Sequence, residues 1–192
     1  MCYYVKDMIN QEEKTINKYS KIIAKFIIDN VRFFRFSETI KWQFVKNPDI
    51  SIIASVNRST NVISVNYNSV DYAYKTNDLM TIEYFLLHEI RHVFQHLIIS
   101  DYKNKQPVSI PIEIVEKWVF EMNHYVKAVD NKGNENKGYF EQDCEMDAYA
   151  FSYAVMKYKY ENVSSLYLPP TFGDEFYEIV NLFIETFKNE KL

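Results

Sequence analysis

The sequence predicts an α+β domain that is mostly helical and contains one small sheet. Apolar residues recur at the helical period over long segments at both ends of the chain, whereas residues 39–67 show the period-two alternation of strands. The chain has 192 residues, 47% of them hydrophobic, with only three Gly and five Pro, which suits one ordered core. We therefore expect a single domain over residues 1–192.

The first half predicts a long helix followed by strands. Isoleucine and valine recur near heptad spacing over residues 8–36, with charged residues on the opposite face. Residues 39–45, 50–56 and 62–67 are rich in β-branched and aromatic residues, and the polar segment 57–61 suits a hairpin connection. We expect a small antiparallel sheet.

The second half predicts helices separated by polar or Pro-containing breaks. The first covers residues 77–100, with Asp78 as a good N-cap and no Gly or Pro inside it. Further helices are expected over residues 110–129, 139–156 and 174–189. The polar segment 130–137 predicts a loop, and the segment 168–173 contains two Pro and one Gly that break the chain before the last helix.

Residues 88–92 read His-Glu-Ile-Arg-His, the HExxH pattern. Positions four apart lie on one face of a helix, so His88 and His92 can bind one metal ion, and Glu89 borders that face and can hold a metal-bound water. The opposite side of the helix is apolar and predicts a core-facing stripe, formed by Leu86, Leu87, Ile90, Val93, Phe94 and Leu97.

A catalytic zinc site needs a third protein ligand. The helix expected over residues 139–156 supplies carboxylates on two faces, one carrying Glu141 and Glu145 and the other carrying Asp143 and Asp147. Both faces also carry small residues that allow close helix packing, so periodicity leaves all four acids open as the ligand.

The pattern His-Glu-x-x-His followed by Glu-x-x-Ala-x-x-Phe resembles the zincin metallopeptidases of gluzincin type, in particular the compact ImmA/IrrE-like group. The similarity covers roughly residues 50–156. It implies a minimal zincin-like fold, with a small sheet before the HExxH helix, and a Zn²⁺ ion held by His88, His92 and Glu145. Glu89 would then be the general base of a peptidase.

The chain departs from that group in two respects. The group usually has Asn or Asp after the Ala of the second motif, where this chain has Tyr149, and the segment 101–138 is longer than usual. The metzincin pattern is absent, because Gln95 and Ile98 stand where that pattern requires Gly and a third His.

Other polar residues near the motif have expected roles. Tyr149 and His124 are candidates for stabilising the oxyanion, and Asp147, if it is not a ligand, would support the site from behind the ligands. Arg91 is expected in a surface ion pair. Cys144 falls on the apolar stripe of its helix and is expected in the core.

Composition and charge exclude several classes of function. The net charge is −4 and no run of Lys or Arg forms a basic stripe, so nucleic-acid binding is not indicated. No apolar stretch approaches the roughly 20 residues that span a bilayer, and residues 1–11 lack a secretory signal. The two Cys form neither a disulfide framework nor a CxxC site, which favours a reducing, cytoplasmic compartment.

The sequence thus predicts a zinc-dependent peptidase that acts on a protein or peptide substrate inside the cell. The alternatives are a regulatory or binding protein that keeps the zincin fold around a structural metal, and an interaction domain without metal. Glu89 favours the enzyme, because a structural site needs no base beside its ligands.

Overall fold

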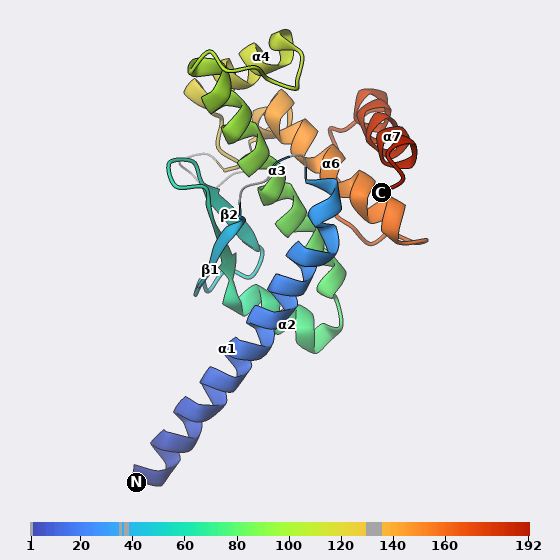
Figure 1. The fold of residues 1–192 in the computed structure, drawn as a ribbon. Coiled ribbons are helices and arrows are strands. Elements are labelled where there is room, and N and C mark those ends of the chain that lie inside the picture. The colour runs from blue at the N-terminus through green and yellow to red at the C-terminus, as the bar shows by residue number, and fades with distance from the viewer. Residues whose placement is uncertain (1, 35, 37–38, 130–135) are drawn as a thin grey trace.

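The computed structural model describes residues 2–34, 36, 39–129 and 136–192, with side chains from residue 13 onward. It is an α+β fold in which one three-stranded sheet lies at one side of the helices (Figure 1). The strands are β1 (Lys41–Val45), β2 (Ala54–Asn57) and β3 (Val62–Asn66). The helices are α1 (Cys2–Asn30), the 3₁₀ turn η1 (Val31–Phe33), α2 (Tyr67–Thr76), α3 (Leu79–Lys103), α4 (Ile112–Asn123), α5 (Lys137–Phe140), α6 (Asp143–Lys159) and α7 (Asp174–Asn189).

Helix α3 lies at the centre of the molecule, between the sheet and the pair α6 and α7 (Figure 1). One side of α3 packs on the sheet, α1 and α2 through Ile82, Leu86 and Ile90. Its other side packs on α6 through Tyr84 and Leu87. Since α3 is buried on both sides, the polar residues along it are buried as well. The first half of α1 extends away from this body (Figure 1).

The sheet is mixed and not antiparallel as predicted. Strands β2 and β3 form the expected antiparallel hairpin, but β1 pairs with β3 in parallel, so the strand order is β1-β3-β2. The buried side chain of Asn66 explains this order, because it binds the connection between β1 and β2. Its Nδ2 donates to the carbonyls of Asp49 and Ile52, at 2.9 Å each, and its Oδ1 accepts from the amide of Asn47. The connection therefore crosses the end of β3 and leaves β2 as an edge strand.

The ladder determines which main-chain groups of β2 point away from the sheet. The Asn66 amide donates to the carbonyl of Ile53 at 2.8 Å, so Ile53 and, by alternation, Ser55 face β3. The main-chain groups of Ala54 and Val56 therefore point toward the open edge.

Helix α2 was not predicted. It follows β3 without a break, because the Asn66 side chain also caps its first turn by accepting from the amide of Asn68. The helix ends at Asn77, whose φ of 59° is left-handed. Asp78 precedes α3 as predicted, but its side chain accepts from the Thr81 hydroxyl and not from a backbone amide.

The carboxylate helix is interrupted where it was predicted to be continuous. Helix α5 ends at Phe140 and α6 begins at Asp143, and the side chain of Gln142 between them bonds both main-chain groups of Val126. Helix α4 also ends earlier than predicted, at Asn123. Helix α7 has its predicted limits, and Cys144 is buried in the core as predicted. Of the predicted loop 130–137, residues 130–135 lie outside the described residues.

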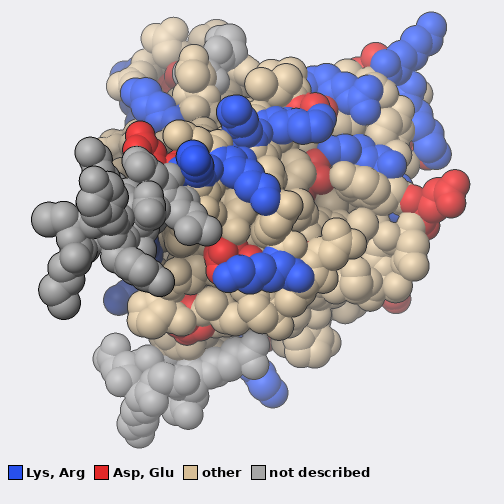
Figure 2. Space-filling view, turned by 90° about the horizontal axis from the view of Figure 1, so that it is seen from below, with Lys and Arg blue, Asp and Glu red and all other residues tan. Residues whose placement is uncertain are grey.

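On the face of the molecule shown in Figure 2, most Lys and Arg side chains lie in the upper half, with a few acidic side chains between them. The lower right of this face is largely uncharged. Among the described residues, no helix combines the length and the apolarity that crossing a membrane requires.

A buried polar cluster joins α1, α3 and the end of α6. Glu83 on α3 is 1% exposed and accepts hydrogen bonds from Asn30 Nδ2 at 2.6 Å, from the Tyr160 hydroxyl at 2.7 Å and from the Lys159 ammonium. Lys159 also donates to Asn30 Oδ1 at 2.9 Å. A buried carboxylate is stable only when its oxygens are satisfied in this way, so the cluster fixes the position of α3 along α1 and α6.

We predict that Glu83→Ala lowers the free energy of unfolding by about 3 kcal/mol, because it leaves the Lys159 ammonium without its carboxylate. Chemical denaturation measures this. The matched control is Asp29→Ala, which breaks the exposed Lys25–Asp29 pair and should cost less than about 1 kcal/mol. Equal losses in the two variants would contradict a structural role for the cluster.

Candidate metal centre

Two imidazoles of α3 converge on one point. His88 and His92 lie one turn apart, their rings are nearly perpendicular at 88°, and their Nε2 atoms are 3.0 Å apart. Both side chains are buried. This is the arrangement that the HExxH spacing predicts for a helix.

Helix α6 brings Glu145 to the same point. Its Oε2 lies 3.4 Å from each of the two Nε2 atoms, and the side chain is fully buried. Glu121 of α4 sets the start of α6, because its carboxylate accepts from the amides of Asp143 and Cys144 at 2.7 and 2.9 Å. Glu145 is thus in the first turn of a helix that packs closely on α3.

The other three acids proposed as ligands lie elsewhere. Glu141 is exposed in the break between α5 and α6. Asp143 pairs with Lys117 at 2.9 Å, and Asp147 pairs with Arg91. Among the described residues, the group of side chains that could hold a metal ion is therefore His88, His92 and Glu145.

The chemistry of the three ligands fits a divalent metal such as zinc. With Zn–N and Zn–O distances of about 2.0–2.1 Å, ligand atoms of a tetrahedral site are roughly 3.3 Å apart, close to the separations here. Oε2 of Glu145 has no hydrogen-bond partner among the described residues, although it is fully buried. Burying such an atom is costly, so an unpartnered oxygen that faces two imidazole nitrogens indicates a cation site.

The three groups shift one another's pKa. Burial opposes the charged form of Glu145, but the His92 and His88 imidazoles outweigh it and hold the Glu145 pKa well below its usual range. Burial also disfavours a charged His92, yet the Glu145 carboxylate raises the His92 pKa to about 9. Without metal, His92 therefore carries a proton at neutral pH.

Glu89 lies beside the three ligands and not among them. Burial raises the Glu89 pKa, and the nearby Glu145 adds to this, while His88, His92 and a main-chain hydrogen bond from Val56 lower it in part. A raised carboxylate pKa is typical of a group that accepts and returns protons near neutral pH.

Glu89, His92 and Glu145 line one side of a cavity of about 240 Å³ between β2 and α3. The lining residues are Ala54, Ser55, Val56, Arg58, Glu89, His92, His96, Met122, Tyr125, Tyr139 and Glu145. The candidate metal centre therefore opens onto a space that is bordered by the edge strand.

A chain of hydrogen bonds behind His92 fixes the direction of its ring. Gln95 Oε1 accepts from His92 Nδ1 at 2.8 Å, while Gln95 Nε2 donates to Asp147 Oδ2 at 2.8 Å and to the Cys144 carbonyl at 2.9 Å. Because Gln95 Nε2 faces two acceptors, the orientation of the Gln95 amide is determined, and its Oε1 must face His92. His92 therefore donates from Nδ1, and its own Nε2 points toward Glu145.

Arg91 completes this chain and is not the surface residue that was predicted. It is 5% exposed and donates through two nitrogens to the two oxygens of Asp147, at 2.8 and 3.0 Å. Its guanidinium also stacks over Phe94. Asp147 therefore contacts both Arg91 and Gln95, and its role in supporting the ligands stays a prediction.

His88 is held differently, by ring packing. Its ring centroid lies 4.3 Å from that of the buried Tyr149, and its Nδ1 has no hydrogen-bond partner among the described residues. Tyr149 lies behind this imidazole and does not line the cavity. Its position therefore favours orienting His88 over stabilising an oxyanion.

The structure does not bring His124 to the site. His124 is exposed at the end of α4, where Nδ1 contacts the Phe120 carbonyl at 2.9 Å and the ring stacks on Phe120. His96 borders the cavity, and its Nδ1 contacts Asn61 Oδ1 at 2.9 Å. Burial, with the charges of His92 and Arg58, lowers the His96 pKa to about 4, so this residue is neutral at pH 7.

Sequence reasoning missed two tyrosines that line the cavity. The Tyr125 hydroxyl donates to Glu145 Oε1 at 2.6 Å, and burial together with Glu145 raises the pKa of Tyr125 and Tyr139. Both phenols therefore stay protonated at neutral pH, and the Tyr125 proton is donated to Glu145. Neither belongs to a motif, and Tyr125 lies in a segment that was predicted to be helical.

Comparison of the chain with protein-family models, with curated proteins and with solved structures found no match.

We predict that Gln95→Leu weakens zinc binding by roughly 10- to 100-fold, because His92 loses the acceptor that fixes its ring. Competition with a chelator of known affinity measures this. The control is Gln106→Leu, an exposed position beyond α3 that should bind zinc like the parent. If Gln95→Leu also binds like the parent, the amide does not orient a ligand.

Zinc affinity should also depend on pH. Zinc must displace the His92 proton, so its affinity should be constant above about pH 9 and fall up to roughly tenfold per unit below it. Calorimetric titration in two buffers of different protonation enthalpy should detect about one proton released per ion at pH 7. Affinity that stays constant from pH 9 to pH 7 would contradict a protonated His92.

Proposed function

We propose that this protein is a zinc-dependent metallopeptidase. The observation that carries the proposal is the buried set His88, His92 and Glu145, whose unpartnered Oε2 faces both imidazoles beside the base Glu89. Two imidazoles and one carboxylate, with an acid at the position after the first His, are the ligand set and base of HExxH peptidases. A reducing, cytoplasmic setting is part of the proposal and rests on the sequence alone.

When bound by these three residues, zinc would lower the pKa of a coordinated water and polarise the carbonyl to be cleaved. Glu89 would accept the proton of the attacking water and return it to the leaving amine, which its raised pKa favours. Tyr139 borders the same cavity as a neutral phenol, so it is better placed than His124 to donate to the developing oxyanion.

Strand β2 supports a peptide as the substrate. It is an edge strand, it lines the cavity, and the main-chain groups of Ala54 and Val56 point away from β3. An extended peptide could pair with this edge and place its own carbonyl beside the three ligands. The amide of Val56, which bonds Glu89, would then be available to the peptide once Glu89 binds water.

The test is Glu89→Gln in purified protein. The parent should contain about one zinc ion per chain by plasma mass spectrometry and cleave peptides in a randomised synthetic mixture. Glu89→Gln should keep the zinc and lose at least about 100-fold in cleavage rate, because the amide cannot accept the proton. The control is Glu141→Gln, an exposed acid on the break before α6, which should retain both properties.

Absence of stoichiometric zinc from the parent, or cleavage that survives Glu89→Gln, would refute this function. Zinc binding without cleavage of any peptide by the parent would instead favour the non-catalytic alternative.

A further inference from the structure

The cavity at the candidate metal centre continues into a second one. The second cavity, of about 460 Å³, lies along the C-terminal part of α3 and shares Arg58, His96 and Met122 with the first. The two cavities therefore adjoin at these three residues, and we refer to them together as the groove. We call the second cavity the distal end of the groove; its remaining lining residues are Ile99, Ser100, Lys103, Asn104 and Asn123.

The two ends of the groove differ in charge. The end at the metal centre is lined by the carboxylates of Glu89 and Glu145, with Arg58 at the boundary between the two ends. The distal end contains the cations Arg58 and Lys103, and none of its described lining residues is Asp or Glu. We therefore expect the groove to bind a ligand more tightly when the ligand places a negative group at the distal end.

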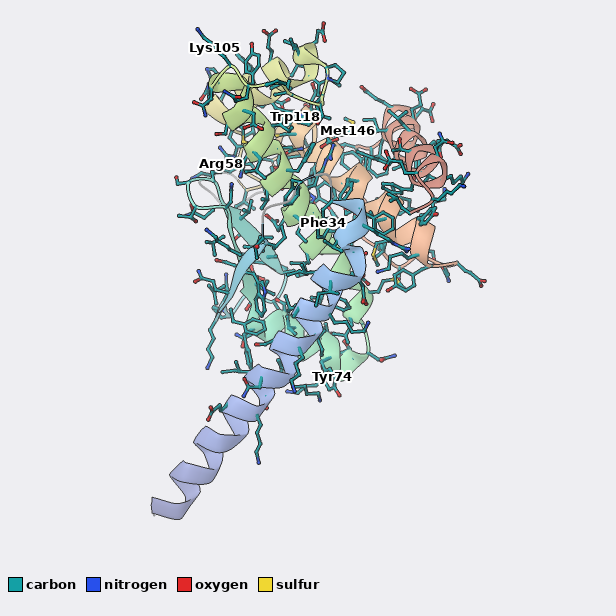
Figure 3. All side chains as sticks on the ribbon, viewed as in Figure 1. Phe34, Arg58, Tyr74, Lys105, Trp118 and Met146 are labelled. Carbon is teal, nitrogen blue, oxygen red and sulfur yellow. The ribbon has the colours of Figure 1, made fainter. Side chains whose placement is uncertain are left out.

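Arg58 stands where β2 ends and the hairpin turns, beside α3 (Figure 3). Its Cζ lies 3.8 Å from the centre of the Tyr125 ring, and Nη1 donates to the Met122 carbonyl at 3.2 Å. Within the described part of the chain, the Arg58 guanidinium thus contacts a ring and a carbonyl and no carboxylate. The guanidinium is thus held in place, and apart from Nη1 its N–H donors make no hydrogen bond to the described residues.

Tyr125 links this guanidinium to the metal centre. Its hydroxyl donates to Glu145 Oε1 at 2.6 Å, and its ring packs against the Arg58 guanidinium. The Tyr125 side chain therefore lies between Arg58 and Glu145. A peptide paired with Ala54 and Val56 on the edge of β2 would run past Asn57 and reach Arg58 within a few residues.

We infer that Arg58 is the specificity residue of this groove and binds a carboxylate of the substrate peptide close to the bond that is cleaved. This inference rests on the proposed peptidase function and adds the class of substrate. The carboxylate is either an Asp or Glu side chain or the C-terminus of the peptide, since the fork of Arg58 binds both alike. Lys103 adds positive charge at the distal end of the groove.

The first experiment maps cleavage by the zinc-loaded protein in a randomised peptide mixture that carries free or amidated C-termini. Mass spectrometry should find Asp and Glu enriched at one fixed position, or cleavage at a fixed distance from free C-termini alone. The first pattern assigns a side chain to Arg58 and the second assigns the terminal carboxylate. Cleavage without either pattern would refute the inference and leave the peptidase function intact.

The second experiment compares kcat/KM for two peptides that differ only in Glu against Gln at that position, or in a free against an amidated C-terminus. Arg58→Gln should lower the acidic-to-neutral ratio roughly 10- to 100-fold, because a charge-assisted hydrogen bond is lost. Arg58→Glu should reverse the preference. Lys105→Gln removes an exposed cation beyond α3 that does not line the groove, and should leave the ratio unchanged (Figure 3). An unchanged ratio in Arg58→Gln would overturn the assignment.

A binding measurement separates this inference from the proposed function. Fluorescence anisotropy with labelled Glu-rich and Gln-rich peptides is measured on the Glu89→Gln protein and on the same protein carrying Arg58→Gln. If the parent cleaves nothing but binding of the acidic peptide depends on Arg58, the peptidase proposal falls and the acidic site stands. If the parent cleaves nothing and binding does not depend on Arg58, both fall.

Discussion

The packing of α6 on α3 is the constraint on which the candidate site depends. It places the carboxylate of Glu145 in a fully buried position, 3.4 Å from both imidazoles of the HExxH helix. One oxygen of this carboxylate accepts a hydrogen bond from Tyr125, and the other makes no hydrogen bond among the described residues and faces both Nε2 atoms at 3.4 Å. An apolar helix contact would be more stable without this group. Together with the two imidazoles, the carboxylate forms a group that could hold a metal ion.

The surroundings of the two imidazoles are unequal, which has consequences for their roles. His92 is oriented by a chain of hydrogen bonds through Gln95 and Asp147 to Arg91, so its ring cannot turn without breaking a buried network. The His88 ring packs on the Tyr149 ring, and its Nδ1 has no hydrogen-bond partner among the described residues. We therefore expect His92 to be the more rigid ligand, and His88 to adjust when metal enters.

The sequence predicted what local periodicity can encode. His88 and His92 are four residues apart, which is about one helical turn, so the sequence predicts that they lie on the same face. Their Nε2 atoms are 3.0 Å apart. The carboxylate helix has no comparable rule, because two of its faces carry acids; only the family resemblance pointed to Glu145. Its packing on α3, which separates Glu145 from Asp147, is a tertiary contact that no window of sequence contains. The same holds for Tyr125, which reaches Glu145 across 20 residues, and for the parallel pairing of β1, which Asn66 determines through a distant connection.

The central claim is that one metal ion is bound by His88, His92 and Glu145. A crystal structure of the zinc-loaded protein, with anomalous data on both sides of the zinc absorption edge, tests it most directly. One strong peak is expected within about 2.1 Å of both Nε2 atoms and of the Glu145 carboxylate. A peak at other side chains, or no peak at this position in protein that contains zinc, would contradict it.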